Sequence, residues 1–185
     1  MNQVLDTIAA RRSHRAYAPT QLTEEQIQIL LKAGMDSPSA VNRQPWHFTV
    51  VQNQKLLDEL NKAVWEETMK QNPENRSPRF SDPNFDVFYH APTVIFISAD
   101  KENYWNHMDS GIACQNICLA AESIGLGTVI LGMPRAAFQN EKADQFRKAL
   151  HFPQTHDFTI AIAVGTPADD KPAHLHAPDR ISFVR

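Results

Sequence analysis

The sequence is poor in cysteine and has no hydrophobic run long enough to cross a membrane. Its two cysteines, Cys114 and Cys118, are too few for a disulfide scaffold, and we interpret them as buried thiols on one helix face. A zinc site would need two further ligands from elsewhere in the chain. The amino terminus lacks a basic segment followed by a long apolar stretch. We therefore expect no signal peptide, a cytoplasmic location and no membrane partner.

An excess of charge of one sign is also missing. The 18 Lys and Arg residues nearly balance the 21 Asp and Glu residues, for a net charge of −3. Without a basic excess, we expect no nucleic-acid partner. Hydrophobic residues make up 42% of the 185-residue chain, which is enough for a sizeable core. We expect one domain over residues 1–185.

Several motifs of common enzyme classes are absent. The chain has no Gly-x-Ser-x-Gly elbow and no Walker motif, so neither an α/β-hydrolase nor a P-loop NTPase is indicated. Gly125-Leu126-Gly127 stands between an expected helix and a strand, the reverse of the order in a dinucleotide fingerprint. Gly132, at the end of that strand, is either a turn residue or a backbone donor to a ring nitrogen.

Hydrophobic periodicity predicts alternating helices and strands without a regular βαβ rhythm. Thr23 and Gln26 form a capping box, and Gly34 is expected to end the helix that follows. Helices are expected over 4–9, 27–34, 56–64, 109–124 and 142–150, and strands over 46–51, 93–98, 128–131 and 158–164. One mixed sheet with helices on both faces fits this pattern best.

Two expected loops interrupt the pattern. Residues 37–45 are closed by prolines, and residues 72–84 contain prolines but no apolar period. A loop as long as 72–84 is often a lid or a mobile segment. Asp109, near the start of the long helix, is interpreted as its cap.

The run Arg11-Arg12-Ser13-His14-Arg15 is the most informative feature present. In an extended segment Arg11, Ser13 and Arg15 share one face and span about 13 Å. Arginine grips phosphate with two hydrogen bonds, so the run suits a ligand with a phosphate at one end and an electron-rich ring at the other. The alternative is a basic helix end whose cations compensate the helix dipole.

Amide side chains at Asn42 and Gln44 can face one ligand, and each offers donors and an acceptor. They suit a ring edge with alternating carbonyl and N–H groups. The small Ser39 and Ala40 would let backbone approach such a ring. A polar surface loop with local turns remains the alternative.

Two histidines, His174 and His176, lie in the polar tail near Asp169 and Asp170. They could contact a phosphate. A metal site, as in a metal-dependent hydrolase, lacks a convincing third ligand.

Taken together, these motifs resemble the flavin-dependent nitroreductase family. The similar segments run in family order along nearly the whole chain: 11–15, 37–48, His90-Ala91-Pro92, 109–116, 125–132 and 164–168. The resemblance implies an α+β fold with a mixed central sheet flanked by helices. It also implies a homodimer with FMN at the subunit interface and a tail, about 165–185, that extends to the partner.

The resemblance further implies roles for individual residues. Arg11, Arg12 and Ser13 would hold the phosphate and ribityl chain, and Arg15 would approach N1 and O2 of the ring. The partner subunit would supply Pro38, Ser39 and Ala40, with Asn42 and Gln44 near the cofactor. Leu131 and Gly132 would lie beside flavin N5. The family tail often supplies an Arg or Lys to the phosphate, but here His176, together with His174, stands near that position.

These roles predict an oxidoreductase that uses FMN and takes hydride from NADH or NADPH. A small-molecule acceptor, such as a nitroaromatic or quinone, would follow in a ping-pong scheme. Arg15 tunes the ring, and no side chain acts as a separate catalytic group or metal ligand. The alternatives are a flavin-binding or sensing protein without turnover, or enone reduction, dehalogenation or dehydrogenation on the same fold.

Overall fold

The computed structural model describes residues 2–173 and 175–185. Each helix and strand that the periodicity predicts is present, with small differences at the ends. The helices are α1 (Gln3–Ala10), α2 (Glu24–Met35), α3 (Gln54–Met69), α4 (Asn106–Ser123) and α5 (Ala143–Ala149). The strands are β1 (Trp46–Val51), β2 (Thr93–Asp100), β3 (Gly127–Leu131) and β4 (His156–Gly165). The predicted capping box of α2 is confirmed, because Thr23 and Gln26 bond each other's backbone.

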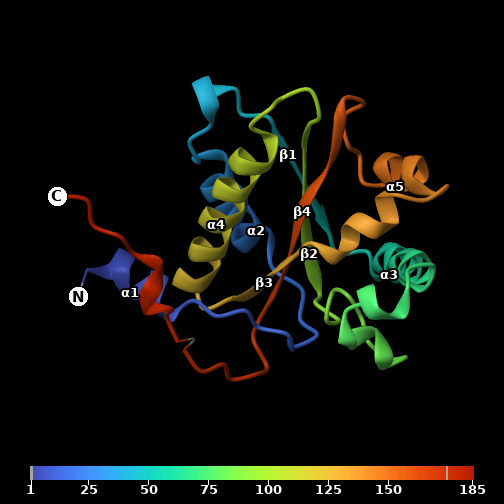
Figure 1. Cartoon of the computed structure of the whole chain (residues 1–185), viewed down its shortest axis with the longest axis horizontal. Coiled ribbons are helices and arrows are strands. Elements are labelled where there is room, and N and C mark those ends of the chain that lie inside the picture. The colour runs from blue at the N-terminus through green and yellow to red at the C-terminus, as the bar shows by residue number, and fades with distance from the viewer. Residues whose placement is uncertain (1, 174) are drawn as a thin grey trace.

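The strands form one sheet in the order β1-β2-β4-β3, and each neighbouring pair is antiparallel. A parallel contact comes from the bridge between Ser13 and Thr128, so the segment after α1 runs beside β3. Helices α2 and α4 lie on one side of the sheet, and α3 and α5 lie on the other (Figure 1). The α+β prediction, with helices on both faces, is confirmed.

Each face of the sheet has its own hydrophobic core. Along β2, Val94 and Phe96 pack toward α3 and α5, whereas Ile95 and Ile97 pack toward α2 and α4. This alternation explains why β2 reads as a continuous apolar run, since both of its faces are covered.

Gly34 does not end α2, so that prediction was wrong. The helix continues to Met35, and Gly34 is buried against α4. A Cβ at this position would lie 3.0 Å from both Ile117 Cδ1 and Phe48 Cζ. The glycine therefore lets α2 approach α4 and β1 closely.

The segment 72–84 packs against α3 through two short 3₁₀ turns, Pro73–Asn75 and Pro78–Ser81. The buried Phe80 ring meets Trp65 and Phe85 edge-on, with centroid distances of 4.9 and 5.3 Å. Trp65 Nε1 donates to the Phe85 carbonyl at 2.8 Å. The long loop thus carries part of the core on the α3 side.

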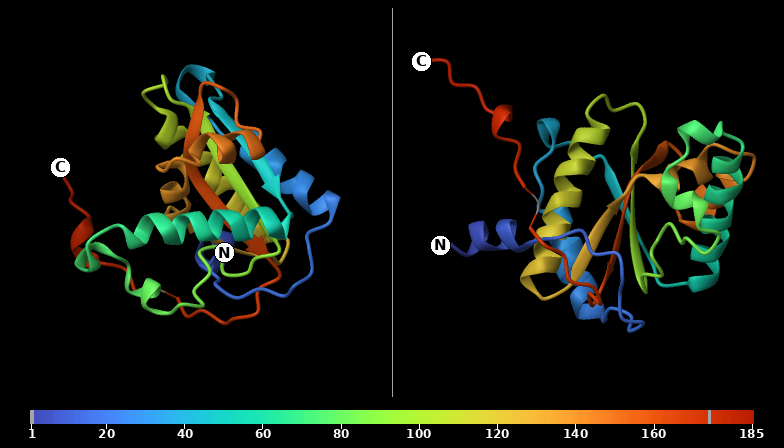
Figure 2. Two further views of the ribbon diagram at one scale, coloured as in Figure 1. Left: turned by 90° about the vertical axis from the view of Figure 1, so that its right-hand side faces the viewer. Right: turned by 60° about the horizontal axis from the view of Figure 1, so that its bottom comes forward.

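Both termini leave the body on the same side, next to α4 (Figures 1 and 2). No residue of α1 is buried, and Val4, Leu5 and Ile8 are 62%, 54% and 50% exposed. An apolar face with this exposure is typical of a contact surface. Among the helices of residues 2–173 and 175–185, none has the length and hydrophobicity needed to cross a membrane.

Candidate functional site

The arginine segment, residues 11–15, is held in an extended form between β3 and the start of the C-terminal tail. His14 N donates to the Thr128 carbonyl at 3.0 Å, which fixes the segment to the edge of β3. Farther along, Ala18 N donates to Thr166 O and Ala168 N donates to Ala16 O, both at 2.9 Å. The segment therefore has backbone partners on both sides.

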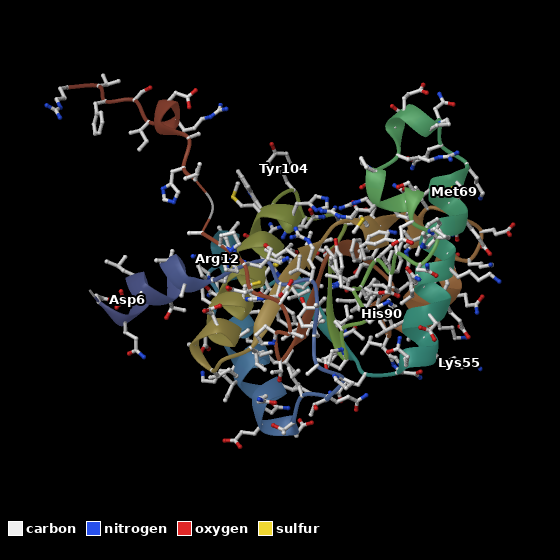
Figure 3. The ribbon with its side chains drawn as sticks, turned by 90° about the horizontal axis from the view of Figure 1, so that it is seen from below. Asp6, Arg12, Lys55, Met69, His90 and Tyr104 are labelled. Atoms are coloured by element: carbon white, nitrogen blue, oxygen red, sulfur yellow. The ribbon has the colours of Figure 1, made fainter. Side chains whose placement is uncertain are left out.

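The predicted anion-binding side chains come together in one cavity of about 460 Å³. Its lining residues are Arg11, Arg12, Ser13, Arg15, Lys171, Pro172 and Ala173. Figure 3 shows Arg12 where α1 joins the body of the molecule. Within residues 2–173 and 175–185, no carboxylate forms an ion pair with Arg11, Arg12 or Arg15. The cavity thus gathers three arginines that lack anionic partners, next to a lysine that is paired with Asp169.

The three arginines are not equivalent. Arg12 Nη1 donates to the carbonyls of Ala9, Ala10 and Arg11, so this side chain closes the end of α1, as the helix-end alternative predicts. Arg12 Nε and Arg11 Nη1 are buried and have no hydrogen-bond partner among the described residues. The Arg15 guanidinium lies over the Tyr89 ring, 5.9 Å from its centroid. Unmatched buried donors indicate that the cavity accepts a ligand rich in acceptor oxygens.

Asp169 is the centre of a small network beside this cavity. It accepts from His14 Nδ1 at 2.7 Å, from the Arg15 backbone N–H at 3.0 Å and from Lys171 Nζ at 3.0 Å. Burial opposes ionisation of Asp169, but hydrogen bonds from Arg15, His14 and Lys171 outweigh it and lower its pKa to about 2. Asp169 therefore stays ionised at neutral pH.

Lys171 is a tail cation in this cavity that the sequence did not single out. It lines the cavity, whereas His176 is exposed and outside the lining. His174 lies outside the described residues. The family's usual Lys or Arg in the tail could have pointed to Lys171, which precedes His174 and His176 in the sequence.

The loop over residues 38–44 is built differently. Ala40 N donates at 3.1 Å to Asp109 Oδ1, and Asp109 is buried. The helix-cap interpretation of Asp109 was wrong, because Trp105 is the N-cap residue of α4 and Asp109 lies one turn farther on. Val41 and Gln44 have φ values of 49° and 48°, in the left-handed region that a β-branched residue such as Val41 rarely adopts.

One chain does not bring the loop and the arginine segment into the same cavity. The predicted loop residues are Pro38, Ser39, Ala40, Asn42 and Gln44, and none of them lines the cavity at the arginines. Asn42 Oδ1 accepts from Gln44 Nε2 at 3.1 Å, so these two amides do share one side, as predicted. Gln44 lines two other cavities instead.

The free edge of β3 offers backbone groups next to the arginine segment. The Thr128 carbonyl points away from β4 toward His14, so by alternation the polar backbone of Ile130 faces the same open edge. Gly132, two residues after Ile130, faces the same edge by the same alternation, and it is exposed. The Leu131 side chain is only 2% exposed and belongs to the core. Of the predicted pair, Leu131 and Gly132, the glycine is the better placed donor.

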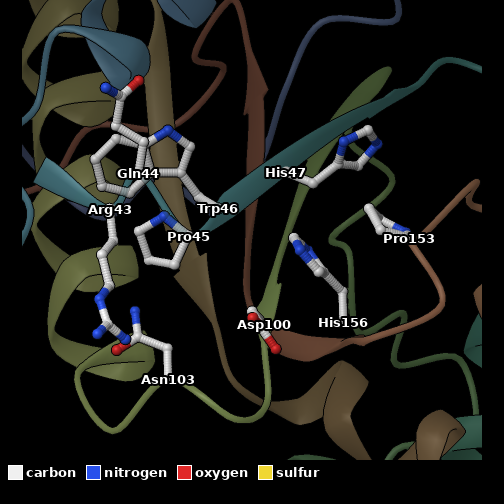
Figure 4. Close-up of a pocket in the computed structure, with 9 residues that line it drawn as sticks. All are labelled: Arg43, Gln44, Pro45, Trp46, His47, Asp100, Asn103, Pro153 and His156. Atoms are coloured by element: carbon white, nitrogen blue, oxygen red, sulfur yellow. The ribbon is translucent and has the colours of Figure 1, made fainter.

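A second polar cavity, of about 430 Å³, lies at the opposite end of the sheet, where β2 ends and β1 and β4 begin. Figure 4 shows His47 facing His156, and Arg43 beside Asn103. The two imidazole rings meet edge-on with centroids 6.3 Å apart, and burial lowers the pKa of His156. No group of three His, Cys, Asp or Glu residues in the described part of the chain is placed to hold a metal ion.

Known proteins share the sequence pattern and the fold. The model of the nitroreductase family matches residues 8–166. A crystal structure of a nitroreductase with bound FMN from Desulfitobacterium hafniense is 31% identical, covers 100% of both chains and superposes with a TM-score of 0.94. An NADPH-flavin oxidoreductase of Vibrio harveyi is 29% identical over 95% of this chain and 72% of its own. An iodotyrosine deiodinase of Thermotoga neapolitana is 23% identical over 94% of each. The chain belongs to the nitroreductase family.

Proposed function

We propose that this protein is an FMN-dependent oxidoreductase that takes hydride from NADH or NADPH and reduces a flat, electron-poor acceptor in a ping-pong scheme. Nitroaromatics and quinones are the acceptor class that the family suggests. The observation that carries the proposal is the set of unpaired guanidinium donors in one cavity at the open edge of β3.

The residues present fit FMN. Arg11 Nη1 and Arg12 Nε are buried donors without partners, which a phosphate could satisfy. Lys171 adds a second type of cation to the same wall, and Ser13 adds a hydroxyl. The relative from Desulfitobacterium hafniense, with the same fold and 31% identity, is described with bound FMN.

When bound, FMN supplies the two-electron chemistry, and the protein supplies binding and electrostatics. Arg11, Arg12, Ser13 and Lys171 hold the phosphate and ribityl end. Arg15, kept in place by the Tyr89 ring and by its own backbone bond to Asp169, provides a fixed positive charge for the pyrimidine edge of the ring. The exposed Gly132 backbone N–H is available to a ring nitrogen.

The proposal includes a homodimer. By resemblance to the family, the loop over residues 38–44 contributes to the cofactor site, yet in one chain it does not line the cavity at the arginines. In this proposal a second copy supplies the loop. The exposed apolar side chains of α1 offer a surface for that copy, and the tail leaves the body beside them (Figure 2). Sedimentation velocity should therefore give a dimer mass, and a monomer that binds FMN fully would contradict the shared site.

The direct test is the visible spectrum of the purified protein, followed by anaerobic titration with NADH and NADPH. We expect a yellow protein whose absorbance near the flavin maximum disappears with one nicotinamide and returns with an acceptor. A colourless preparation that binds no added FMN would overturn the proposal. Bound flavin that neither nicotinamide bleaches would indicate a flavin-binding or sensing protein instead.

Dehalogenation is the alternative reaction on the same site, and it is favoured by the similarity to the deiodinase of Thermotoga neapolitana. Assays with nitroaromatics, quinones and halogenated phenols under one set of conditions separate the two. Release of halide at a rate above nitro or quinone reduction would favour dehalogenation.

Arg15 has a role that can be measured apart from binding. A fixed cation stabilises the negative charge of the reduced ring, so Arg15→Ala should lower the midpoint potential of bound FMN more than it weakens binding. An unaltered potential would remove Arg15 from this role.

A further inference from the structure

The C-terminal tail is fixed to the arginine segment at one point by a side chain. After β4 ends at Gly165, residues 166–168 pair by backbone bonds with residues 16–18. Asp169 then turns its carboxylate toward His14, and the next residues, 171–173, form one wall of the 460 Å³ cavity. The path of the tail at this point decides whether that wall exists.

Both carboxylate oxygens of Asp169 are used. Oδ1 accepts from His14 Nδ1 at 2.7 Å, and Oδ2 accepts from the Arg15 N–H and from Lys171 Nζ, each at 3.0 Å. The side chains of Asp169 and His14 are 16% and 13% exposed, so water competes little for these bonds. The contacts of Asp169 with His14 and Arg15 join residues that are 155 and 154 positions apart in the chain.

We propose that Asp169 is a positioning residue that fastens the tail over the arginine segment and thereby builds the phosphate-binding wall of the cofactor site. The proposal rests on the proposed function for the identity of the ligand, but the fastening itself does not. Asp169 orients the Arg15 backbone on one side and the Lys171 ammonium on the other. Its role is exerted through these residues, because Asp169 is not among the lining residues of the cavity.

The Asp169 carboxylate does not remove Lys171 from ligand binding. An ammonium group carries three N–H donors, and Asp169 takes one of them. The remaining donors are available to phosphate oxygens. The ion pair therefore restricts where the lysine head lies, which lowers the entropy lost when a phosphate binds.

The test is Asp169→Asn in the full-length protein, with Asp170→Asn as the matched control. Both variants remove one negative charge, and Asp170 is exposed next to the fastening point. Hydrogen exchange of the flavin-free protein should rise about tenfold at the amides of Arg15 and Ala168, which donate to Asp169 and to the Ala16 carbonyl, in the first variant only. The Kd for FMN, measured by quenching of flavin fluorescence, should rise by about tenfold in the first variant only.

A double-mutant cycle separates positioning from a general loss of structure. If Asp169 acts through Lys171, then Asp169→Asn should cost much less FMN affinity in a Lys171→Met background than in the wild type. Lys171→Met alone should weaken FMN binding while leaving exchange at Arg15 near the wild-type rate.

The results distinguish the two proposals. If Asp169→Asn has the same hydrogen-exchange rates and the same FMN affinity as Asp170→Asn, then Asp169 does not fasten the tail. Faster exchange with an unchanged FMN Kd would overturn the role of the tail in the phosphate site. A wild-type protein that binds no FMN would overturn the proposed function, and the exchange measurement would still decide whether Asp169 fastens the tail.

Discussion

The arginine segment, residues 11–15, and the loop, residues 38–44, belong to the same proposed site, yet they are built in opposite ways. The arginine segment has backbone partners in β3, and a carboxylate binds the Arg15 amide. The loop is tied to the body by the bond from Ala40 N to Asp109, and Asn116 donates at 2.8 Å to the Oγ of Ser37, the residue just before the loop. Its Val41 is 85% exposed and has left-handed backbone angles.

The difference indicates what each part contributes. A cation cluster has to be organised before the ligand arrives, because flexible arginines would lose entropy on binding. The loop instead has a strained apolar residue, Val41, at its tip. Backbone strain of this kind persists only when neighbouring parts of the structure hold the residue in place. In the dimer that we propose, the surroundings of Val41 include the other copy.

The largest effect should follow from closing the space behind the arginine segment. A Cβ at Gly127 would lie 2.8 Å from His14 Cδ2 and 2.9 Å from Pro167 Cβ, and His14 is held by Asp169. Gly127→Ala should therefore reduce the free energy of unfolding by about 3 kcal/mol. It should also weaken FMN binding, since His14 and the tail have to move apart.

Gly34→Ala is the matched variant on the loop side of the molecule. The nearest neighbours of its Cβ would be side-chain atoms: Ile117 Cδ1 and Phe48 Cζ at 3.0 Å and Ile117 Cγ1 at 3.1 Å. Alanine also favours helix more than glycine does. We expect a loss of about 1 kcal/mol, within the range for mild overpacking, and an unchanged FMN Kd. Chemical denaturation and flavin fluorescence measure both quantities. Equal effects of the two variants on FMN affinity would show that the arginine segment is no more sensitive than the rest of the fold.

Removal of a single cation should have the next largest effect. Arg11→Ala takes away a half-buried arginine whose Nη1 is buried without a partner among the described residues. A charged hydrogen bond of this kind is worth about 2 kcal/mol, or roughly 30-fold in Kd. Arg79→Ala removes the same charge from the exposed surface of the 78–81 turn and serves as the control. Titration of each protein with FMN should show a higher Kd in Arg11→Ala alone. A similar rise of Kd in both variants would show that Arg11 acts only through long-range electrostatics and not through a direct contact.

Acid should loosen the arginine segment through Asp169. Its pKa in the folded protein, about 2, is below the ordinary value of 3.8, so ionised Asp169 stabilises the fold. The sign follows from linkage: the contribution is complete above about pH 4 and disappears as the pH falls toward 2. We expect about 1–2 kcal/mol. The difference in unfolding free energy between the wild type and Asp169→Asn should be constant at higher pH and shrink in this window; a constant difference down to pH 2 would contradict the ion pairs.

Local patterns allowed most of the fold and the clustering of the arginines in one cavity to be predicted. Arg11 to Arg15 are adjacent in sequence, and an extended segment brings them together without help from the rest of the chain. Lys171 was missed because its place depends on the contact between His14 and Asp169, which no local pattern encodes. Asp109 was misread for the same reason, since its partner, Ala40, follows a different helix. Gly34 was predicted to end its helix because glycine commonly does so. The real reason for the glycine, its close contacts with α4 and β1, comes from residues far away in the sequence.

The smallest expected effect concerns the tip of the loop. Val41 has a φ of 49°, and asparagine adopts this region far more readily than a β-branched residue. Val41→Asn should therefore raise the unfolding free energy of the isolated subunit by about 1 kcal/mol. If the apolar side chain, 85% exposed in one chain, is covered by the second copy, the same variant should weaken dimerisation and FMN binding. Thermal unfolding at low concentration and sedimentation across a concentration series measure the two effects. A variant that gains stability and keeps its dimer would show that Val41 contributes nothing across the interface and that the strain lies in the loop alone.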